Sequence, residues 1–446
     1  MLHKAPDKPY NLCFGTDGVR GRFGTPPMDA KTLTYLCKAV SIFFQQKNQK
    51  EEKPLFLVAR DTRESGKDIE SIIASTFDPF EFNIRFLGVF PTPGLVHEIC
   101  NQSAIGGVMV SASHNPAHDN GIKLFKTNGK KLSSADEQSI LKIFHNVSSQ
   151  HIAPPSQKME KKKGSDTSYA QHLHHLFKGL CLQGVHIVID CAHGAMCEIA
   201  PRVFKSFGAR VTAIGTCPDG HNINDGCGST YPSLLQRKTK ELQADFGVAF
   251  DGDGDRLLFC KGDGTLLDGD QLLAFLALAS PKLTPPIVVS TIMANAAMEE
   301  KLLAHKIKLK RTPVGDKAVA QAMQETGALL GGEASGHLII KPHSTTGDGL
   351  FAALSVLHAL RNKNAPQLPC FKPYPQHIEN ISIRDIRNEK EVFADHTQKK
   401  LQACIKKGRL FLRRSGTEPV LRLTIEAPSK KMLEQALQRA LPLILS

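Results

Sequence analysis

Residues 251–255 read Asp-Gly-Asp-Gly-Asp, and Arg256 follows them directly. Three carboxylates spaced two residues apart on a loop with two glycines can point their oxygens at one centre. Such charges would repel one another strongly if nothing offset them, and a hard divalent cation is the natural counter-charge. Proteins most often hold Mg²⁺ with a few carboxylates and a phosphate oxygen. We therefore expect a site for one Mg²⁺ at Asp251, Asp253 and Asp255, used in phosphoryl chemistry.

Two other kinds of acidic loop can be weighed on the same residues. An EF-hand calcium loop needs Gly at its sixth position and Glu at its twelfth. Counted from Asp251, those positions hold Arg256 and Gly262, which excludes that class of site. A plain acidic hairpin turn stays open, because Asp-Gly is a strong turn signal. A turn, however, needs one Asp-Gly pair rather than three aligned carboxylates.

A second candidate loop, Ser-Ala-Ser-His-Asn-Pro at residues 111–116, follows the apolar stretch Ile105–Val110, which we predict to be a strand. A serine on a loop that leaves a strand end is well placed to meet a ligand in an open α/β sheet, and Ser113 is the candidate. A Ser/Asn-rich turn is the alternative. A Ser–His–Asp hydrolase is disfavoured, because Ser113 lacks a Gly-x-Ser-x-Gly elbow and His114 is its immediate neighbour.

Residues 412–419, Leu-Arg-Arg-Ser-Gly-Thr-Glu-Pro, join two predicted strands near the C-terminus. Arginines, two hydroxyls and a glycine that lets the backbone approach a ligand are the parts of a phosphate cradle. The segment is not a Walker loop, since Gly-x-x-x-x-Gly-Lys-Ser/Thr is absent from the chain. A polar hairpin loop is the alternative interpretation.

Two further glycine-rich tracts carry polar side chains. Residues 331–337, Gly-Gly-Glu-Ala-Ser-Gly-His, place a carboxylate, a hydroxyl and an imidazole within five residues, a set that can bind sugar hydroxyls and move a proton. Residues 14–21, Phe-Gly-Thr-Asp-Gly-Val-Arg-Gly, offer Arg20 to an anion. A structural His337 and a flexible glycine loop are the alternatives.

The elements that must position these loops alternate along most of the chain between β-rich apolar stretches and helical patterns. That alternation favours α/β units with largely parallel, buried strands. After residue 376 the order becomes strand, helix, strand, strand and helix, which is typical of a smaller α+β domain. The predicted strands are Pro54–Ala59, Asn83–Val89, Ile105–Val110, Val185–Asp190, Ala209–Gly215, Phe246–Phe250, Pro286–Thr291 and Ala328–Leu330. The predicted helices are Ser65–Thr76, Cys197–Phe207, Asp348–Arg361, Lys390–Ile405 and Ser429–Leu445.

Three connections divide the chain. Asn146–Thr167 and Ala365–Gln376 are rich in proline or lysine, and a weaker boundary near Lys261–Thr265 rests on Gly-Asp-Gly turn chemistry. We expect three consecutive mixed α/β domains and a C-terminal α+β domain around a central active-site cleft. No short-period repeat is visible. The expected domains are residues 1–160 with the serine loop, 161–262 with the acidic loop, 263–368 with the Glu333 loop and 369–446 with the phosphate cradle.

Composition narrows the class of protein. The 446 residues, 41% hydrophobic and 22% charged, are typical of a globular chain too long for a single core. No stretch approaches the ~20 apolar residues that span a bilayer, and Met1–Gly15 has no apolar core of a signal peptide. We therefore expect a cytoplasmic protein without membrane partners. Eleven cysteines without a Cys-x-x-Cys pair indicate reduced thiols rather than disulfides or a zinc site.

The net charge of +13 fits nucleic acid, an anionic metabolite or a solvated basic surface. Five Tyr, no Trp and no RNA-binding aromatic signature disfavour nucleic acid. The short runs Lys130-Lys131 and Lys161-Lys162-Lys163 lie in polar stretches, so we expect them on the solvated surface. A positive field would still attract a phosphorylated sugar.

Four of these loops occur in the order found in the α-D-phosphohexomutases: the serine loop, the Asp-Gly-Asp-Gly-Asp-Arg loop, the Gly-Glu-x-Ser-Gly-His loop and the Arg-x-Ser-Gly-Thr-Glu-Pro loop. The chain resembles that family over nearly its full length. The resemblance is strongest to the bacterial branch that acts on glucosamine phosphates. The resemblance to this branch rests on residues 218–224, 227–230, 345–349 and 374–376. Ala334, His118 and Lys317-Ala318 depart from the usual pattern of that branch, which commonly has Gln, Tyr and Arg-Tyr there.

The resemblance implies an isomerase that interconverts glucosamine 6-phosphate and glucosamine 1-phosphate through a 1,6-bisphosphate, which also serves as activator, and so supplies UDP-N-acetylglucosamine synthesis. Ser113 would carry the phosphoryl group, and one of its oxygens would join the three aspartates on Mg²⁺. Arg20, His114, Lys123 and His337 would provide acid, base and charge stabilisation. Glu333 and Ser335 would bind sugar hydroxyls. The non-reacting phosphate would be bound by Arg413, Ser415, Gly416, Thr417 and Arg422.

Other functions stay open at this stage. A phosphomannomutase or phosphoglucomutase of the same family would use the same residues, because the departures at Ala334 and His118 affect the loops that recognise the sugar. A Mg²⁺-dependent phosphatase could use Ser113 but has little need for a remote phosphate cradle, and Asp253–Leu257 lacks the haloacid-dehalogenase pattern. A non-catalytic binder would not explain three metal carboxylates. The oligomeric state, monomer or dimer, stays open too.

Overall fold

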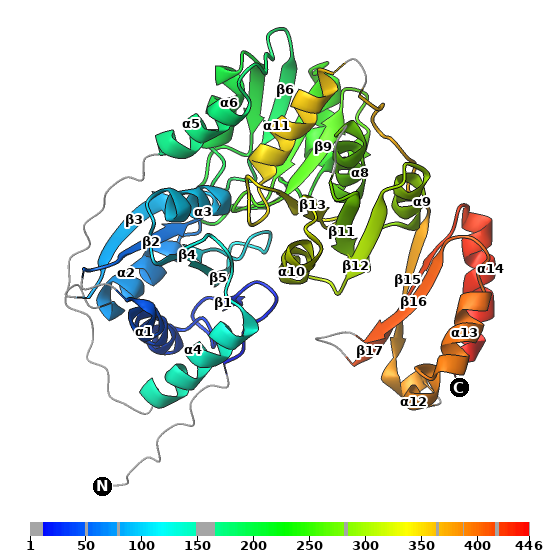
Figure 1. Cartoon of the computed structure of the whole chain (residues 1–446), viewed down its shortest axis with the longest axis horizontal. Coiled ribbons are helices and arrows are strands. Elements are labelled where there is room, and N and C mark those ends of the chain that lie inside the picture. Colours follow the sequence, from blue (N-terminus) through cyan, green and yellow to red (C-terminus); the bar gives the residue numbers. More distant parts are fainter. Residues whose placement is uncertain are drawn as a thin grey trace.

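The computed structural model describes residues 12–49, 52–77, 81–148, 166–280, 284–362, 365–386, 388–414 and 419–445. Its strands form four separate sheets that follow one another along the chain. The four parts lie along an arc, with the last at its free end beside the third (Figure 1). We name them after their sheets: unit I (12–148), unit II (166–267), unit III (268–362) and unit IV (376–445). In these described ranges no helix has both the length and the apolar character needed to cross a membrane.

Unit I is built on a sheet with the strand order β1-β5-β4-β2-β3. β2 pairs in parallel with β3 and β4, whereas β5 runs antiparallel to β4 and to β1. The side chains of β4 are all buried, as expected for a central strand covered on both faces. The strands are β1 (Val19–Arg22), β2 (Leu55–Arg60), β3 (Asn83–Val89), β4 (Gly106–Val110) and β5 (Asp119–Lys126). The helices are α1 (Ala30–Lys47), α2 (Gly66–Thr76), α3 (Thr92–Asn101) and α4 (Ser134–Val147).

Unit II has the strand order β10-β9-β8-β6-β7, with β6 parallel to β7 and β8. Residues 261–265, where the sequence suggests a boundary, form the turn between β9 and β10, so this sheet continues to Leu267. The strands are β6 (His186–Asp190), β7 (Arg210–Ile214), β8 (Phe246–Phe250), β9 (Leu257–Lys261) and β10 (Leu266–Leu267). The helices are α5 (Asp166–Leu176), α6 (Ile199–Ser206) and α7 (Ser233–Glu241).

Unit III has the strand order β12-β11-β13-β14. β11 is parallel to β12 and β13, and β14 returns antiparallel to β13. The strands are β11 (Ile287–Thr291), β12 (Lys308–Thr312), β13 (Leu330–Gly332) and β14 (Leu338–Ile340). The helices are α8 (Gly269–Ala279), α9 (Ala296–Ala304), α10 (Asp316–Thr326) and α11 (Gly349–Leu360).

Units I to III repeat one arrangement that the sequence did not reveal. In each, a first strand (β2, β6 or β11) pairs in parallel with two neighbours, and the later of these neighbours (β4, β8 or β13) is followed by an antiparallel strand. The connection between these last two strands is residues 111–118 in unit I, 251–256 in unit II and 333–337 in unit III. The three candidate loops are therefore equivalent turns of three similar sheets.

Unit IV is smaller and entirely antiparallel, with the strand order β15-β17-β16. It has its own apolar cluster, whereas a single cluster of buried side chains extends through units I, II and III. Its strands are β15 (Gln376–Ser382), β16 (Arg409–Arg414) and β17 (Val420–Glu426). Its helices are α12 (Glu389–Val392), α13 (Asp395–Ala403) and α14 (Lys430–Ala440), with 3₁₀ turns η1 (Ile383–Asp385) and η2 (Leu441–Leu443).

Local chemistry explains where several helices begin. α4 follows Ser133, whose hydroxyl accepts from the amide of Asp136 while the Asp136 carboxylate accepts from the amide of Ser133. α8 begins with the same reciprocal pair at Asp268 and Gln271. The side chain of Asp348 accepts from the amide of Phe351 at the start of α11. Each cap satisfies amide groups that the first helical turn leaves without partners.

The predicted α/β class and the C-terminal α+β unit are confirmed, and the predicted strands Asn83–Val89 and Phe246–Phe250 have the observed bounds. The strand predicted at Ala328–Leu330 is misplaced: β13 begins at Leu330 and continues through two glycines that pair with β11. The predicted helix Lys390–Ile405 is divided into α12 and α13. In the predicted connection Asn146–Thr167, α4 extends to Val147 and α5 begins at Asp166, while residues 149–165 lie outside the described part.

Candidate functional site

The serine loop holds Ser113 in a backbone conformation that side chains rarely adopt. Ser113 has a φ of +54°, in the left-handed region, and its amide donates to Ser111 Oγ at 2.8 Å. Its carbonyl accepts from the guanidinium of the fully buried Arg63 at 3.3 Å and from Asn224 Nδ2 at 2.9 Å. Non-glycine residues in this region persist only where surrounding contacts impose the conformation, and such positions concentrate at functional sites. The hydroxyl of Ser113 is thus held in one place by units I and II.

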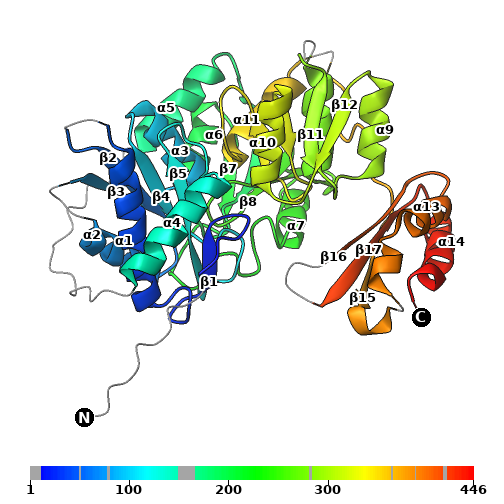
Figure 2. The ribbon, with the colours of Figure 1, turned by 60° about the horizontal axis from the view of Figure 1, so that its bottom comes forward.

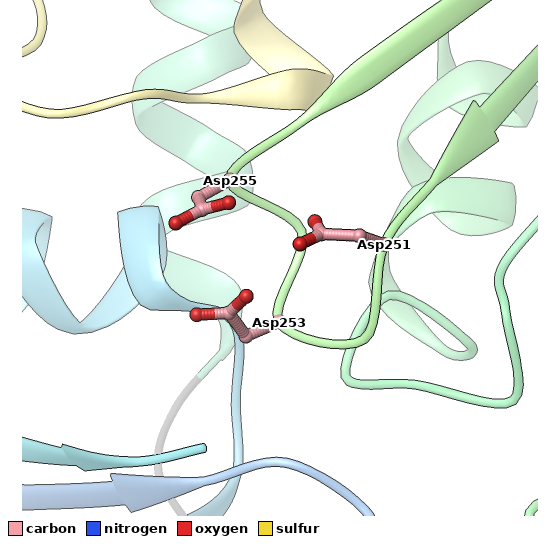
Figure 3. Close-up of side chains that lie close together, drawn as sticks. All are labelled: Asp251, Asp253 and Asp255. Carbon is pink, nitrogen blue, oxygen red and sulfur yellow. The ribbon is translucent and has the colours of Figure 1, made fainter. Parts of the chain in front are cut away.

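The acidic loop joins β8 to β9 and lies directly against the serine loop. A Cβ on Gly252 would meet the Ser113 carbonyl oxygen at 2.5 Å, so only glycine allows this approach. Asp251, Asp253 and Asp255 are buried, and one carboxylate oxygen of each lies within 4.8 Å of the others. Figure 3 shows the three carboxylates close together beside the loop, with an oxygen of each turned toward the others. The hydroxyl of Ser113 donates to Asp251 Oδ2 at 2.5 Å.

The acidic triad fits a hard cation. Oδ1 of Asp253 and of Asp255 are buried and have no hydrogen-bond partner among the described residues, an unfavourable situation for a carboxylate unless a cation or water completes it. Burial, and then the charges of Asp255 and Asp253, raise the pKa of Asp251 to about 7. A divalent ion would remove that repulsion. These three acids could therefore hold a metal ion, with Ser113 beside it.

Lys123 connects the acidic loop to the N-terminal glycine-rich tract. It is fully buried on β5, and its ammonium group lies 2.7 Å from Asp253, 3.0 Å from Asp255 and 2.9 Å from Asp17. Burial opposes its charge, but the three carboxylates together hold the pKa of Lys123 well above its usual value. Lys123 is therefore a fixed positive charge beside the acidic loop.

His337 lies on the other side of Asp255. Its Nδ1 is 3.6 Å from Asp255 Oδ2, and its Nε2 is 3.4 Å from Asp316 Oδ2. Burial lowers the pKa of His337, but Asp255 and Asp316 more than offset this and raise it. The amide of Gly347, however, donates to Nε2 at 2.9 Å, which requires that nitrogen to be unprotonated. Because these influences oppose each other, the imidazole is suited to accept and release a proton.

These groups close into a ring of ionisable side chains drawn from units I, II and III. Lys131 completes it by ion pairs to both Asp17 and Asp316. Burial opposes the charge on Lys131, but Asp17 and Asp316 raise its pKa, while Lys123 and Lys131 bring the pKa of Asp17 well below its usual value despite burial. In order, the ring consists of Asp17, Lys123, Asp255, His337, Asp316 and Lys131. We call it the charge ring.

The remaining predicted catalytic residues line a cavity of about 340 Å³ next to the charge ring. The guanidinium of Arg20 pairs with Asp17 and donates to the carbonyl of Ala112 at 3.3 Å. His114 Nδ1 is 3.4 Å from Ser113 Oγ. Burial, and then the charges of Arg256 and Arg20, lower the pKa of His114 to about 4. His114 is therefore neutral at pH 7 and can accept a hydrogen bond but not serve as a cationic acid there.

The predicted sugar-binding residues lie on the same cavity. Glu333 and Ser335 belong to the turn between β13 and β14 and line it together with Ala334. Glu333 Oε1 accepts from the amide of Gly315 at 3.1 Å, and Ser335 is exposed. A carboxylate held in place by a backbone amide, next to an open hydroxyl, can meet polar groups of a ligand that enters the cavity.

Two of the predicted phosphate-cradle residues, Arg413 and Arg422, are in unit IV. Arg413 on β16 pairs directly with Arg422 on β17 in the strand register. Burial, and then the charge of Arg422, lower the pKa of Arg413, and Arg413 Nε is buried with no partner among the described residues. Like charges opposite each other on a sheet are unfavourable unless an anion joins them. The other predicted cradle residues, Ser415, Gly416 and Thr417, lie outside the described residues.

The structure thus brings most of the predicted residues together in units I to III, and places Arg413 and Arg422 in unit IV. Sequence reasoning missed several members of the site. Lys131, expected on the solvated surface, is instead part of the charge ring, because Asp17 and Asp316 surround its ammonium group. Asp17 is in the glycine-rich tract at residues 14–21, from which sequence reasoning singled out only Arg20. The other missed residues are Asp316, Arg63, Asn224 and Thr92, whose hydroxyl donates to Asp253.

Four models of the phosphoglucomutase/phosphomannomutase family match the chain in order. The α/β/α domains I, II and III match residues 11–151, 167–264 and 268–370, and the C-terminal domain matches residues 384–441. Phosphoglucosamine mutase of Phenylobacterium zucineum is 38% identical over 438 residues, covering 95% of this chain and 96% of its own. That of Desulfotalea psychrophila is 39% identical over 428 residues, covering 93% and 94%.

Solved structures have the same fold. A phosphoglucomutase/phosphomannomutase family protein of Burkholderia thailandensis superposes with a TM-score of 0.76 at 22% identity, covering 96% of both chains. Aspergillus fumigatus N-acetylphosphoglucosamine mutase, in complex with GlcNAc-6P and magnesium, superposes with a TM-score of 0.64 at 18% identity, covering 97% of this chain and 96% of its own. The fold and the site thus define an enzyme, a phosphohexomutase, which moves a phosphoryl group within a sugar phosphate. The chain belongs to the phosphoglucomutase/phosphomannomutase family.

Proposed function

We propose that the chain is a cytoplasmic phosphoglucosamine mutase that interconverts glucosamine 6-phosphate and glucosamine 1-phosphate through a phosphorylated Ser113 and glucosamine 1,6-bisphosphate. Relatives of that name match it at 38–39% identity over more than nine-tenths of its length. The observation that carries the mechanism is the 2.5 Å contact between Ser113 Oγ and Asp251, two residues 138 positions apart in separate units. A reactive hydroxyl beside three acids is the arrangement that phosphoryl transfer needs.

The first half-reaction would move the phosphoryl group from Ser113 Oγ to a free hydroxyl of the sugar phosphate. The bond between phosphorus and the serine oxygen breaks, and the bond to the sugar oxygen forms. The sugar hydroxyl gives its proton to a base, and the freed serine oxygen takes up a proton to become a hydroxyl again. His337 is our candidate for that base, because its imidazole has opposing influences on its protonation. Lys123 and Arg20 would stabilise the negative charge on the transferring oxygens. Mg²⁺ held by Asp251, Asp253, Asp255 and the phosphoserine would offset the same charge.

The second half-reaction returns the other phosphate of the bisphosphate to Ser113, so the intermediate must turn around. We propose that Arg413 and Arg422, with Ser415, Gly416 and Thr417, bind whichever phosphate is not reacting. Unit IV has a separate apolar core, and its backbone enters from residues 365–376. That segment would act as a hinge that opens for reorientation and closes for chemistry. Stiffening it should reduce kcat, and unchanged kinetics would count against the hinge.

The assignment can be tested with glucosamine 6-phosphate, Mg²⁺ and a trace of the 1,6-bisphosphate. Appearance of glucosamine 1-phosphate supports the mutase. Net release of phosphate would support a hydrolase, and no reaction would support a binding protein. Removal of Mg²⁺ by EDTA should abolish the isomerisation, and added Mg²⁺ should restore it and raise the Tm, since an ion that binds only the folded state stabilises it.

Sugar selectivity needs a separate measurement, because Ala334 lines the cavity in which the sugar would lie. Comparing kcat/KM for the 6-phosphates of glucosamine, glucose and mannose gives the preference directly. We expect glucosamine to lead. A preference for mannose or glucose would reassign the substrate while leaving the reaction class and its residues unchanged.

A further inference from the structure

A second cavity, of about 410 Å³, lies between units I and III, and all of its lining residues except Lys131 and Asp316 of the charge ring lie outside the site described above. One wall comes from the end of β5 and the start of α4, and the other from α10 and from residues around β14. Figure 2 shows α10 of unit III next to this part of unit I, and the ion pair of Lys317 with Glu137 at 2.7 Å joins α10 to α4. The walls therefore belong to two units held together at this edge.

The polar lining of the cavity is mainly basic. Of its five lysines, three are neutralised: Lys126 pairs with Asp136 at 3.0 Å, Lys317 pairs with Glu137, and Lys131 belongs to the charge ring. The other two, Lys130 and Lys341, have no carboxylate within ion-pair distance in the described ranges. The ammonium group of Lys130 donates to the neutral amide oxygen of Gln324, at 3.0 Å.

These two ammonium groups influence each other. Burial, and then the positive charge of Lys130, lower the pKa of Lys341. The single unpaired acid of the lining, Glu325, accepts from the side chain of Gln321 at 2.9 Å rather than from either lysine. Lys130 is exposed and Lys341 is half-buried, and an anion of charge about −2 bound beside them would balance their two charges.

A third polar group in the cavity wall also has no partner. Thr346 is 2% exposed, and its Oγ1 has no hydrogen-bond partner among the described residues. The neighbouring Thr345, by contrast, donates to the Gly129 carbonyl at 2.9 Å. A buried hydroxyl without a partner is costly and points to a group that completes it. The rest of the wall includes the apolar side chains of Leu132, Ala320 and Ile339.

We propose that this cavity binds a small phosphorylated metabolite, with its phosphate between Lys130 and Lys341 and its less polar part against Leu132 and Ile339. A phosphate matches the two uncompensated charges, since a phosphate monoester carries about −1.5 to −2 at pH 7. The volume suits a ligand of metabolite size. The site is separate from Ser113 and does not depend on the proposed reaction. It borders the charge ring, however, because Lys131 and Asp316 also line it.

Phenyl phosphate, which combines a phosphate with an apolar ring, is the probe. Titrated calorimetrically into the full chain, it should occupy two classes of site, the cavity and the arginine pair of unit IV. Lys341→Met should weaken the cavity component about tenfold or more, as expected for loss of a charge-assisted hydrogen bond. Thr346→Val should weaken it by roughly threefold. Arg413→Met should remove the other component and leave the cavity component intact.

Lys205→Met, which removes an exposed charge from α6, is the matched control and should titrate as wild type. The Lys341→Met variant should keep its isomerase activity, so failure of this site and failure of the proposed function are separable. If glucosamine 6-phosphate displaces phenyl phosphate from the Arg413→Met variant, the ligand of the cavity is a sugar phosphate such as the substrate. If UMP displaces it, the ligand is a nucleotide. A wild-type titration without a component that Lys341→Met weakens would overturn the proposal.

Discussion

The charge ring and the arginine pair of unit IV differ in how their charged side chains are compensated. In the ring, Lys123 and Lys131 each contact at least two carboxylates. In unit IV, Arg413 and Arg422 face each other across neighbouring strands, and burial and the charge of Arg422 lower the pKa of Arg413. One region has its counter-charges built in, whereas the other places two like charges opposite each other.

This difference suggests separate roles for the two regions: the charge ring preorganises the site, and the arginine pair recognises the ligand. A buried charge costs several kcal/mol unless partners compensate it, so the ring is stable as folded and can hold Ser113 and the acids in place before substrate arrives. In unit IV, a bound phosphate would compensate the charges of the two arginines, as proposed above. We therefore expect substitutions in the ring to lower stability and activity together, and substitutions in unit IV to lower affinity alone.

The largest effect on activity should come from Ser113→Ala, which removes the hydroxyl that would carry the phosphoryl group. We expect isomerase activity to fall by at least ~10³-fold, because no other group can carry the phosphoryl group. Intact mass should show one phosphate on the wild type and none on the variant. The fold should be unchanged by circular dichroism. Ser139→Ala, on the exposed face of α4, is the control, and full activity in Ser113→Ala would disprove the phosphoserine mechanism.

The two regions also differ in how far the sequence could predict them. Asp251, Asp253 and Asp255 share one short loop, so spacing alone placed them at one centre. Ser113 was a candidate from its place after a predicted strand and Arg413 from the composition of its loop, and the family resemblance added their roles. The charge ring was not predictable as a ring, because Lys131 and Asp316 are 185 positions apart and each looks like an ordinary surface residue in the sequence. The equivalence of the three loops was hidden for a related reason: strand order, not local sequence, makes them equivalent.

A second test sharpens the contrast by breaking the ring. Lys123→Met leaves the buried Asp253 and Asp255 and the partly buried Asp17 without their shared cation, which should lower the free energy of unfolding by about 3–5 kcal/mol. Lys67→Met is the matched control, because Lys67 pairs with Glu64 at 3.2 Å on the surface and its loss should cost no more than about 0.5 kcal/mol. Urea unfolding measures both. Equal losses in the two variants would show that the ring is not specially stabilised by Lys123.

A substitution in the arginine pair of unit IV should change the affinity for substrate without lowering the stability of the protein. Arg413→Met should raise KM for glucosamine 6-phosphate by about 10- to 100-fold, the range for loss of a charge-assisted contact. Its Tm without ligand should stay the same or rise slightly, because a like-charge repulsion is relieved. Arg414→Met removes the neighbouring guanidinium, which instead pairs with Glu389 at 2.6 Å, and should leave KM unchanged. A marked loss of Tm in Arg413→Met would place that arginine with the built-in charges.

Asp348 supplies a third case, a buried acid paired with a neutral group. Both of its carboxylate oxygens accept from the hydroxyl of Tyr169 at 2.8 Å, and burial raises the pKa of Asp348 from 3.8 to about 6, although the Phe351 amide and Tyr169 lower it in part. The folded protein therefore binds the proton more tightly than the unfolded chain. This contribution to stability is complete below pH 3.8 and is lost as the pH rises through about 6.

Asp348→Asn removes that titration while keeping a residue that can cap α11. Between pH 5 and pH 7, the free energy of unfolding of the wild type should fall relative to the variant by about 1 kcal/mol, the smallest effect predicted here. Urea unfolding of both proteins at the two pH values measures the difference. A difference that does not change with pH would mean that Asp348 keeps its ordinary pKa in the folded protein.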